Sequence, residues 1–355
     1  MTWQDVIPAR GAAALDAPIS DSRRAVRIWL FAIAALIFVM VLVGGATRLT
    51  ESGLSITQWK PVTGVLPPLS DADWREEFTR YQQIPQFAQM NADMTLQGFK
   101  TIFYWEWSHR LLARVIGAAF ILPALWFWRR GQLRGAVGRR VGIATALLAL
   151  EPIVGWWMVS SGLSERTEVA QERLAMHLLI AAAVYGTLIY AGVGLSARPR
   201  GGAPAGFRWA AGVFAALVFG QLGLGALVAG LRAGLLYNTW PLMDGRWIPS
   251  GVFGLTPWAR SIVDDVTTAQ FDHRMVAYVV VIFALAQARF AARVGSRLTA
   301  RAFVLAGIAC AQAALGVITL LWVVPIGLAL AHQAMALLLF GLAMAHASAT
   351  RAEIA

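Results

Sequence analysis

Cysteine and charged residues are scarce in this sequence, and each scarcity excludes a class of structure. The 355 residues contain one cysteine, Cys310, so the chain cannot form an intramolecular disulfide. Only 14% of the residues are charged and 58% are hydrophobic, whereas a soluble domain has about 25% charged residues. Apolar runs of about 20 residues, the length that spans a bilayer core, recur along the chain. These features exclude a soluble protein.

The apolar runs predict an all-α polytopic membrane protein with eight transmembrane helices. The predicted spans are 26–47, 109–129, 140–161, 172–194, 208–230, 272–292, 300–322 and 327–348. A Gly/Pro-rich linker divides the chain into two halves of four helices. The predicted organisation is a tail at 1–25, a first half at 26–196, the linker at 197–207, a second half at 208–348 and a tail at 349–355.

The first half contains an unusually long connection, residues 48–108, between its first two predicted helices. Within it, aromatic residues are spaced along a predicted amphipathic helix: Trp74, Phe78, Tyr81 and Phe87. Connections of this length usually serve as lids or binding segments. We therefore expect it to cover a binding site in the first half.

The net charge of +11 describes membrane topology and contact with anionic lipid rather than binding of nucleic acid. The arginines gather in the N-terminal tail and in the second, fourth and sixth connections, whereas the other connections hold most of the acids. Short basic connections stay in the cytoplasm, so both termini are predicted to be cytoplasmic. The tail 1–25 lacks the apolar core of a signal peptide. We expect an uncleaved, multi-pass protein of the bacterial inner (plasma) membrane.

The two halves repeat one another. Ser52–Trp59 resembles Ala233–Trp240, and the offset that places Ser52 on Ala233 is called the repeat offset below. Such a repeat predicts two pseudo-symmetric four-helix bundles, related by an axis near the membrane normal. The other matched positions are His109-Arg110 with His273-Arg274, Glu151 with Gln312, Gly155 with Gly316, and His177 with His332.

Four of the five histidines form two repeat-related pairs near the outer starts of predicted helices. They are His109 with His177 in the first half and His273 with His332 in the second. Inward side chains on facing helices of a bundle hold cofactors, and two histidines can take both axial positions of a haem iron. Zinc would need three or four ligands. The alternative is that these histidines are hydrogen-bonded residues at the membrane interface. His346, which has no counterpart, is predicted to be structural.

An arginine directly follows the first histidine of each pair. Arginine binds carboxylates in bidentate geometry. Arg110 and Arg274 are therefore predicted to contact haem propionates. The alternative is that both arginines meet lipid phosphate at the membrane surface.

One acid distinguishes the first site from the second. Glu106 precedes His109 by three residues, and Gln270 stands at the same place before His273. Residues three apart share a helix face. A carboxylate can move a proton or stabilise a cation, and an amide cannot. Glu106 is therefore predicted to be catalytic, with a solvated acid of the connection as the alternative.

A second acid, Glu151, lies inside the third predicted span. An ionisable group at such a position is a functional candidate. Pro152 follows it and removes a backbone hydrogen bond one turn earlier, so Glu151 could instead accompany a kink. The sequence favours neither interpretation.

Four longer segments resemble the haem A synthase family, which serves cytochrome c oxidase assembly. They are Gly44–Ser55, Trp59–Gly64, Glu106–Arg110 and Gly155–Leu163, and the likeness runs from about residue 27 to residue 348. Some members carry a cysteine pair in an outer connection. This chain has none and is similar to the cysteine-free subtype.

The resemblance implies that the first half oxidises a ring methyl group of haem O to a formyl group, which gives haem A. It implies that Glu106, His109 and His177 belong to the substrate site. It also implies that His273 and His332 ligate a haem b cofactor. Haem O synthase and cytochrome c oxidase assembly factors are the implied partners, no motif identifies the electron donor, and a homo-oligomer stays open. The family more often has glutamine at the position of Glu151, which argues against a general catalytic role for this residue.

Two other functions fit part of the pattern. A two-haem electron carrier of cytochrome b type would explain the histidines, but not the difference between Glu106 and Gln270 or the long connection. A transporter with a parallel repeat would carry ionisable residues and broken helices near mid-membrane in both halves. The repeated polar residues here are predicted at the outer rim, so we expect a haem-oxidising enzyme.

Overall fold

The computed structural model describes residues 21–196, 203–294 and 299–351. Within these ranges the chain forms helices and no β-strand, and eight helices are long and apolar enough to cross a membrane. The predicted fold class, an all-α polytopic membrane protein, is confirmed. Most of the predicted tails 1–25 and 349–355 and of the linker 197–207 lies outside the described residues.

The eight long helices alternate in direction along the chain. They are α1 (Asp21–Leu49), α4 (Leu96–Arg129), α5 (Gly135–Ser160), α6 (Gln171–Ser196), α7 (Ala205–Gly230), α9 (Val266–Val294), α10 (Thr299–Leu321) and α11 (Ile326–Thr350). The connections contain short helices: η2 (Thr63–Val65), α2 (Asp71–Tyr81), α3 (Pro85–Met90), η3 (Ala233–Leu235), η4 (Trp258–Arg260) and α8 (Ser261–Asp264).

The predicted start of α4 at residue 109 is wrong, because the helix begins at Leu96. Thr95 caps it, with its hydroxyl accepting a hydrogen bond from the backbone N–H of Gly98 at 3.2 Å. The first turns bury Phe99 and Phe103 against the preceding connection rather than in lipid. They fall outside the apolar run, so hydropathy does not detect them.

The predicted start of α9 at residue 272 is wrong for a similar reason, since this helix begins at Val266. Asp265 precedes it and accepts a hydrogen bond from the backbone N–H of Thr268 at 2.8 Å. This cap adds a polar first turn to the apolar run. Glu106 and Gln270 therefore both lie inside helices.

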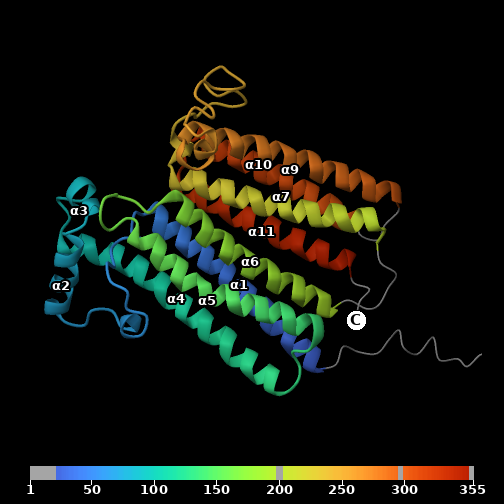
Figure 1. Cartoon of the computed structure of the whole chain (residues 1–355), viewed down its shortest axis with the longest axis horizontal. Coiled ribbons are helices and arrows are strands. Elements are labelled where there is room, and N and C mark those ends of the chain that lie inside the picture. Colours follow the sequence, from blue (N-terminus) through green and yellow to red (C-terminus); the bar gives the residue numbers. More distant parts are fainter. Residues whose placement is uncertain (1–20, 197–202, 295–298, 352–355) are drawn as a thin grey trace, which may run out of the picture.

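The connection between α1 and α4, residues 50–95, forms a small cap that packs on the start of α4 (Figure 1). Its α2 begins at a capping box, in which Ser70 and Asp73 each accept a hydrogen bond from the other's backbone N–H. The expected single amphipathic helix is in fact two helices, because α2 ends at Tyr81 and Phe87 belongs to α3. The aromatic core of the cap and of the start of α4 comprises Trp74, Phe78, Tyr81, Phe87, Phe99 and Phe103.

The long helices pack as two similar sets. In the first set, α1 and α5 each contact both α4 and α6. In the second set, α7 and α10 each contact both α9 and α11. The histidine-bearing helices, α4 and α6 or α9 and α11, thus occupy diagonal positions in each set. The sets meet where α6 and α11 pack on one another, with α1 on α11 and α7 on α6 beside them (Figure 1).

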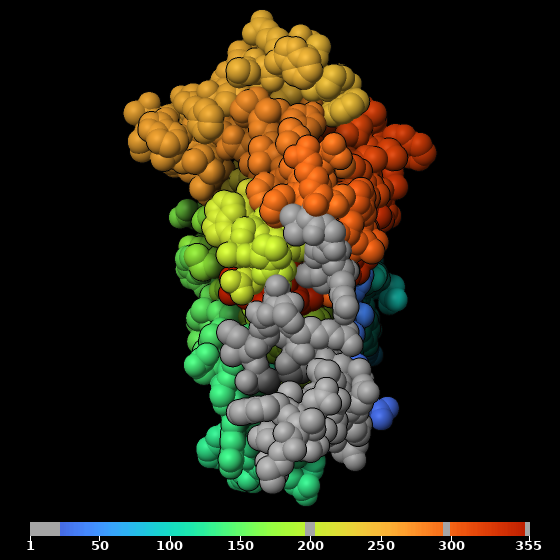
Figure 2. Space-filling model, turned by 90° about the vertical axis from the view of Figure 1, so that its right-hand side faces the viewer, coloured from blue at the N-terminus to red at the C-terminus, as the bar shows by residue number. Residues whose placement is uncertain are grey.

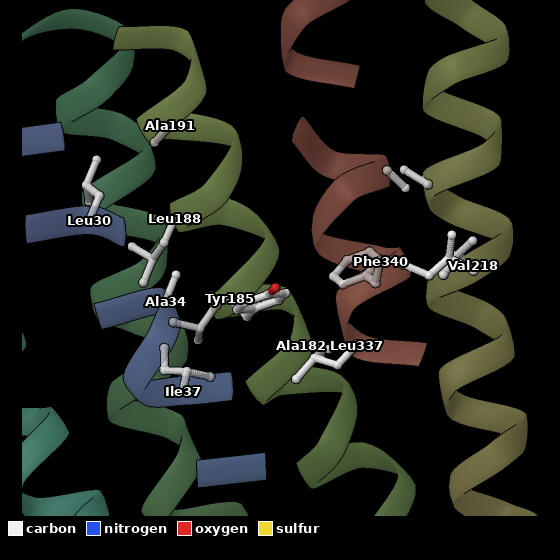
Figure 3. Close-up of a cluster of buried hydrophobic side chains, with 14 of the residues drawn as sticks. Leu30, Ala34, Ile37, Ala182, Tyr185, Leu188, Ala191, Val218, Leu337 and Phe340 are labelled. Atoms are coloured by element: carbon white, nitrogen blue, oxygen red, sulfur yellow. The ribbon is translucent and has the colours of Figure 1, made fainter. Parts of the chain in front are cut away.

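The contact between α6 and α11 is reciprocal. A Cβ on Gly341 would lie 2.3 Å from the hydroxyl oxygen of Tyr185, and one on Gly186 would lie 2.8 Å from the ring of Phe340. Each aromatic ring therefore occupies the space that a glycine leaves on the other helix, as small residues allow between membrane helices. Figure 3 shows Tyr185 and Phe340 facing each other in this core, which surrounding apolar side chains continue into both sets.

Both long connections project from one end of the helical array, opposite to the first residue of α1 and the last residue of α11 (Figure 1). The connection between α7 and α9 also protrudes sideways beyond the helices, as the gold region in Figure 2 shows. The four paired histidines lie on the first turns of α6, α9 and α11 and on the middle of α4, toward this same end.

Candidate functional site

Each of the four paired histidines lies against a glycine of a neighbouring helix. A Cβ on Gly44 of α1 would lie 3.0 Å from Nε2 of His109, and a Cβ on Gly225 of α7 would lie 3.2 Å from Cε1 of His273. Gly44 and Gly225 are themselves related by the repeat offset. A larger residue at either place would displace the imidazole.

The second histidine of each pair has the same arrangement. A Cβ on Gly155 of α5 would lie 3.1 Å from Cε1 of His177, and a Cβ on Gly316 of α10 would lie 2.7 Å from Cε1 of His332. The sequence repeat had matched these two glycines without assigning them a role. Together the four contacts show that both halves make room for two imidazoles.

In the second half the two imidazoles face one another. The ring centroids of His273 and His332 are 6.4 Å apart, with an angle of 77° between the ring planes. A metal–imidazole bond is about 2.0 Å long, so an iron bound by both rings would place their centroids roughly 6 Å apart. The observed spacing fits a haem iron with two histidine ligands.

Two glutamines hold these imidazoles in place. The side-chain amide nitrogen of Gln221 lies 3.0 Å from Nδ1 of His273 and donates to the histidine's own carbonyl at 2.8 Å. Gln312 repeats both contacts with His332, at 3.1 and 3.0 Å. The amide oxygens of both glutamines are buried without a partner. Rotating either amide by half a turn would let the oxygen accept the Nδ1 proton of a metal-bound imidazole, in exchange for the hydrogen bond to the histidine's carbonyl.

In the first half neither histidine has a glutamine. Glu151 takes the place of Gln312, and its Oε2 lies 2.5 Å from Nδ1 of His177. The carboxylate approaches without the alignment of a hydrogen bond, and neither its oxygens nor Nδ1 of His177 has another hydrogen-bond partner among the described residues. Glu151 therefore belongs to the histidine site, a contact that the sequence interpretation missed because it placed this residue deeper than the rim.

His109 differs from the other three. Its ring has no hydrogen bond and no ion pair with the residues that the structure describes. The position that corresponds to Gln221 on α1 is Met40, four residues before Gly44 as Gln221 is before Gly225. A thioether is a weak acceptor and not a donor, so it does not hold an imidazole as an amide does.

Glu106 is buried, with 3% of its surface exposed, so the interpretation as a solvated acid is wrong. Its Oε2 accepts hydrogen bonds from the hydroxyl of Ser55 and the backbone N–H of Ile56, each at 2.8 Å. Its Oε1 accepts from Nη2 and Nε of Arg110 at 2.6 and 3.1 Å. The carboxylate is thus held in one orientation, one helical turn from His109.

Gln270 is equally buried but less well satisfied. Its amide nitrogen donates to the carbonyl of Tyr237 at 3.3 Å, and its Oε1 has no partner. The Nε of Arg274 is also buried without a partner, whereas the Nε of Arg110 binds Glu106. The exchange of Glu for Gln leaves a donor and an acceptor unpaired in the second half.

Both arginines bind the preceding connection in the same register. Arg110 donates to the carbonyls of Ile56 and Gln58. Arg274 donates to those of Tyr237 and Thr239, which are the same two positions at the repeat offset. The repeat therefore extends to the backbone contacts. The Nε of Arg274 is buried without a partner, and propionate contact stays a prediction for both arginines.

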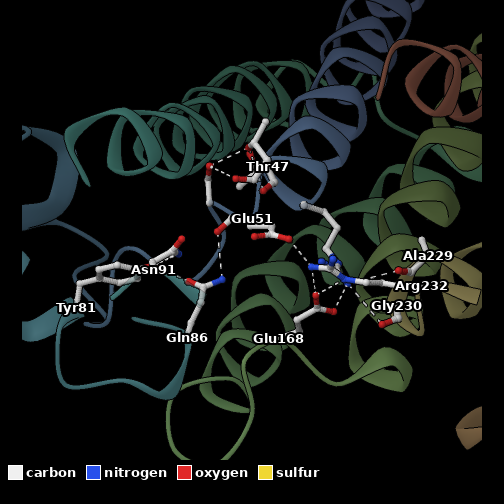
Figure 4. A network of polar contacts seen from close by, with 12 residues as sticks. Thr47, Glu51, Tyr81, Gln86, Asn91, Glu168, Ala229, Gly230 and Arg232 are labelled. Atoms are coloured by element: carbon white, nitrogen blue, oxygen red, sulfur yellow. Dashed lines mark hydrogen bonds and ion pairs between the residues drawn. The ribbon is translucent and has the colours of Figure 1, made fainter. Parts of the chain in front are cut away.

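A polar network joins the two halves beside the sites (Figure 4). Arg232, after α7, forms ion pairs with Glu168 and with Glu51, which is its repeat counterpart. Arg48 pairs with Glu168 at 2.5 Å. Burial opposes the charge of Arg232, but its hydrogen bonds to both glutamates outweigh this and raise its pKa.

The network continues into the cap. The side-chain amide of Gln86 donates to the carbonyl of Glu51 at 3.2 Å, and the hydroxyl of Tyr81 donates to Gln86 at 3.0 Å. Burial raises the pKa of Tyr81, which keeps this hydroxyl protonated as a donor. The cap is thereby fixed to the boundary between the halves.

The donor sets suit haem rather than a bare metal ion. In the part of the chain that the structure describes, no three His, Cys, Asp or Glu side chains cluster as metal ligands. His346 is buried on α11 beside Phe207, at a ring-centroid distance of 5.4 Å, in agreement with a structural role. Among the described residues, each half thus brings two imidazoles to its site without a third His, Cys, Asp or Glu placed to ligate the same metal ion.

Comparison with known families gives one match over most of the chain. Residues 27–344 match the COX15-CtaA family, described as cytochrome oxidase assembly protein. This range includes all four paired histidines and both residues of the Glu106–Gln270 comparison.

Individual relatives agree with the family match. The haem A synthase of Rhodopseudomonas palustris (strain BisA53) is 56% identical over 318 residues, which cover 89% of this chain and 88% of the relative. That of Beijerinckia indica is 49% identical over 356 residues and covers 98% and 99% of the two chains. That of Bradyrhizobium diazoefficiens is 52% identical over 328 residues and covers 92% and 91%.

Proposed function

The chain belongs to the COX15-CtaA family of cytochrome oxidase assembly proteins, and we propose that it oxidises a methyl group of haem O to a formyl group to give haem A. Several relatives that are about half identical over most of their length are named haem A synthases. The observation that carries the proposal is the pair of matched histidine sites, of which only the first has a buried carboxylate on the same helix as a histidine.

The first half is proposed as the substrate site. His109 and His177 would hold the iron of haem O, and Glu106 would stand one turn from His109. Conversion of a methyl group and one water to a formyl group releases four electrons and four protons, so it requires an external electron acceptor, reached one electron at a time through haem b of the second half. The carboxylate of Glu106 would stabilise positive charge at the methyl carbon or receive one of these protons. It is held for this by four donors, so it needs little reorganisation during the reaction.

The second half is proposed as the site of a resident haem b. His273 and His332 would be its axial ligands, and Arg274 would bind a propionate through its free Nε. Bound haem b would supply one-electron transfer. Gln221 and Gln312 would fix the orientation of the two imidazoles, which is what second-shell partners of metal ligands do.

The two sets of helices are proposed to be two pseudo-symmetric four-helix bundles in a bacterial plasma membrane. Their helix contacts and the reciprocal seats of Tyr185 and Phe340 support this. Short basic connections support a cytoplasmic location for both termini, with the haem sites toward the periplasm. Haem O synthase and oxidase assembly factors are the proposed partners. The cap on α4 would cover the substrate site.

The test is expression in cells that make haem O but lack their own haem A synthase, followed by extraction of the membrane haems. The native chain should yield haem A. The double variant His109→Ala/His177→Ala should yield haem b but no haem A, because the second site is left intact. A native chain that binds haem b and leaves haem O unchanged would instead support the two-haem electron carrier.

A further inference from the structure

The four histidines differ in what holds their rings, and this difference divides the first pair. Of the four, three have a polar side chain at Nδ1: Gln221 at His273, Gln312 at His332 and Glu151 at His177. His109 has no such partner: its ring makes no hydrogen bond with described residues, and the sequence position on α1 that matches Gln221 is Met40.

Partners at Nδ1 have a large effect on ligation. An acceptor at Nδ1 fixes the tautomer that leaves Nε2 free for the metal, and it raises the basicity of the ligand. A carboxylate is a stronger acceptor than an amide. Loss of such a partner typically lowers metal affinity by roughly 10- to 100-fold. By this criterion His177 is the best-supported ligand of the four and His109 the least.

We propose that His177, backed by Glu151, is the fixed axial ligand of the substrate iron and that His109 is the exchangeable one. The proposal rests on the function proposed above, since the iron is that of haem O. Glu151 is then a positioning residue that acts through His177. When His109 leaves, the iron opens toward α4, the helix that also carries Glu106.

The second half provides the reason for the asymmetry. A haem that only transfers electrons keeps both ligands, and both of its histidines are held by glutamine. A substrate haem must enter, react and leave, so one firm and one weak ligand suit it better. The carboxylate at His177 and the lack of a polar partner for His109 among the described residues supply these.

The first test compares His109→Gly with His177→Gly in the purified chain. Haem O plus haem A is measured per haem b, and the haem b content confirms that each variant folds. The first-site haem should stay within about twofold of native in His109→Gly, in a five-coordinate high-spin state. It should fall roughly tenfold or more in His177→Gly, as expected for loss of the anchoring ligand. Equal losses, or the reverse order, would overturn the proposal.

The same result separates the two proposals. If the native chain retains haem b but contains neither haem O nor haem A, the proposed function fails. If it contains them and both glycine variants lose them equally, the function stands and the ligand asymmetry fails.

A second test exchanges the supporting residues and uses carbon monoxide as the probe. Reduced bis-histidine iron binds carbon monoxide only when one ligand leaves. The native chain should bind one carbon monoxide per two haems, and Met40→Gln should slow this binding roughly tenfold. Gln221→Met, the matched change in the second half, should allow binding at both haems. Unchanged rate and stoichiometry in these two variants would contradict the role of Met40.

A third test addresses Glu151 through the reduction potential. Glu151→Gln should raise the midpoint potential of the first-site haem, because an amide donates less electron density through the imidazole than a carboxylate does. Gln312→Glu should lower the potential of haem b. A merely structural role for Glu151 would leave the potential unchanged in a folded, haem-loaded variant, and that result would remove it from the proposal.

Discussion

Each half of this chain holds two histidines against glycines at matching positions, but the side chains around these histidines differ between the halves. In the second half the neighbouring polar groups are the amides of Gln221, Gln270 and Gln312. In the first half, Glu106 and Glu151 replace two of these amides and Met40 replaces the third. One scaffold thus presents two different chemical environments through exchanges of single side chains, and the proposed difference in function resides in these sites and not in the fold.

The halves also differ in what covers them. The first half has a folded cap with an aromatic core, whereas the corresponding connection of the second half is formed of turns, the 3-10 helices η3 and η4 and the four-residue helix α8. Exposed tryptophans lie on that second connection, including Trp247 and Trp258. A cap is expected over a site that must exclude water during a reaction. This agrees with a reacting first half and an electron-transferring second half.

The largest effect is expected from replacing Glu106, the carboxylate that the second half lacks at the matching position, Gln270. Glu106→Gln should lower haem A formation at least about 100-fold, the loss associated with removing a preorganised charged group. Haem b should remain bound. The measurement is haem extraction from cells that supply haem O.

Gln270→Glu is the matched control for this prediction. It places a carboxylate beside the unpaired Nε of Arg274, so haem A formation should persist. Haem A from Glu106→Gln at the native level would keep the enzyme but remove Glu106 from its mechanism.

The next largest effect concerns the cap. Trp74 is buried and packs edge-on against Phe103 at a ring-centroid distance of 5.0 Å. Trp74→Ala should destabilise the cap by about 3–5 kcal/mol. Limited proteolysis should then cut residues 50–95, and the haem O content should fall while haem b is retained. The control is Trp258→Ala, at an exposed site of the other connection, which should change neither the proteolysis of residues 50–95 nor the haem O content. Equal loss of both haems in Trp74→Ala would show that the cap does not serve the first half alone.

A smaller effect is expected at the glycines that lie against the histidine rings. Gly316→Ala places a Cβ 2.7 Å from His332, closer than the 3.1 Å between a Cβ at Gly155 and His177. Gly316→Ala should therefore reduce haem b content roughly tenfold, and Gly155→Ala should reduce haem O content less. Gly307→Ala on the same helix as Gly316 meets no atom within 4 Å and is the control. Full haem b content in Gly316→Ala would show that the seat is not tight.

The smallest effect is expected where the halves are joined by charge. Glu168 pairs with both Arg48 and Arg232, so Glu168→Gln should lower the free energy of unfolding by about 1 kcal/mol, with less effect at high salt. Arg232 has a raised pKa, so its contribution is present at neutral pH and is lost as the pH rises through the titration of arginine; protonating its glutamate partners at acid pH also removes it. Thermal unfolding at several salt concentrations and pH values measures the loss of stability in Glu168→Gln and the pH dependence of the Arg232 contribution.

Glu165→Gln, an exposed change in the same connection, should leave thermal unfolding unchanged. A salt-independent loss of stability in Glu168→Gln would mean that packing rather than charge joins the halves at this point.

The sequence is enough to predict the fold class, because eight apolar runs of bilayer length can form only helices in lipid. It also determined which histidines correspond, because the repeat preserves their order. The sequence did not determine the starts of α4 and α9, since their first turns are stabilised by caps and by the aromatic core rather than by hydropathy.

The residues around each histidine come from neighbouring helices, so they can be identified from the packing of the helices and not from the sequence. Glu151 and His177 lie on different helices, α5 and α6, and no periodicity places their side chains in contact. The relevance of Gln221 and Met40 becomes visible only when α7 is seen to pack on α9 and α1 on α4, the helices that carry His273 and His109. The repeat offset could have paired these two positions, but it carries no information on what they face. Contacts between helices depend on how helices cross, and that is set by the glycine seats and aromatic rings of the whole packed core.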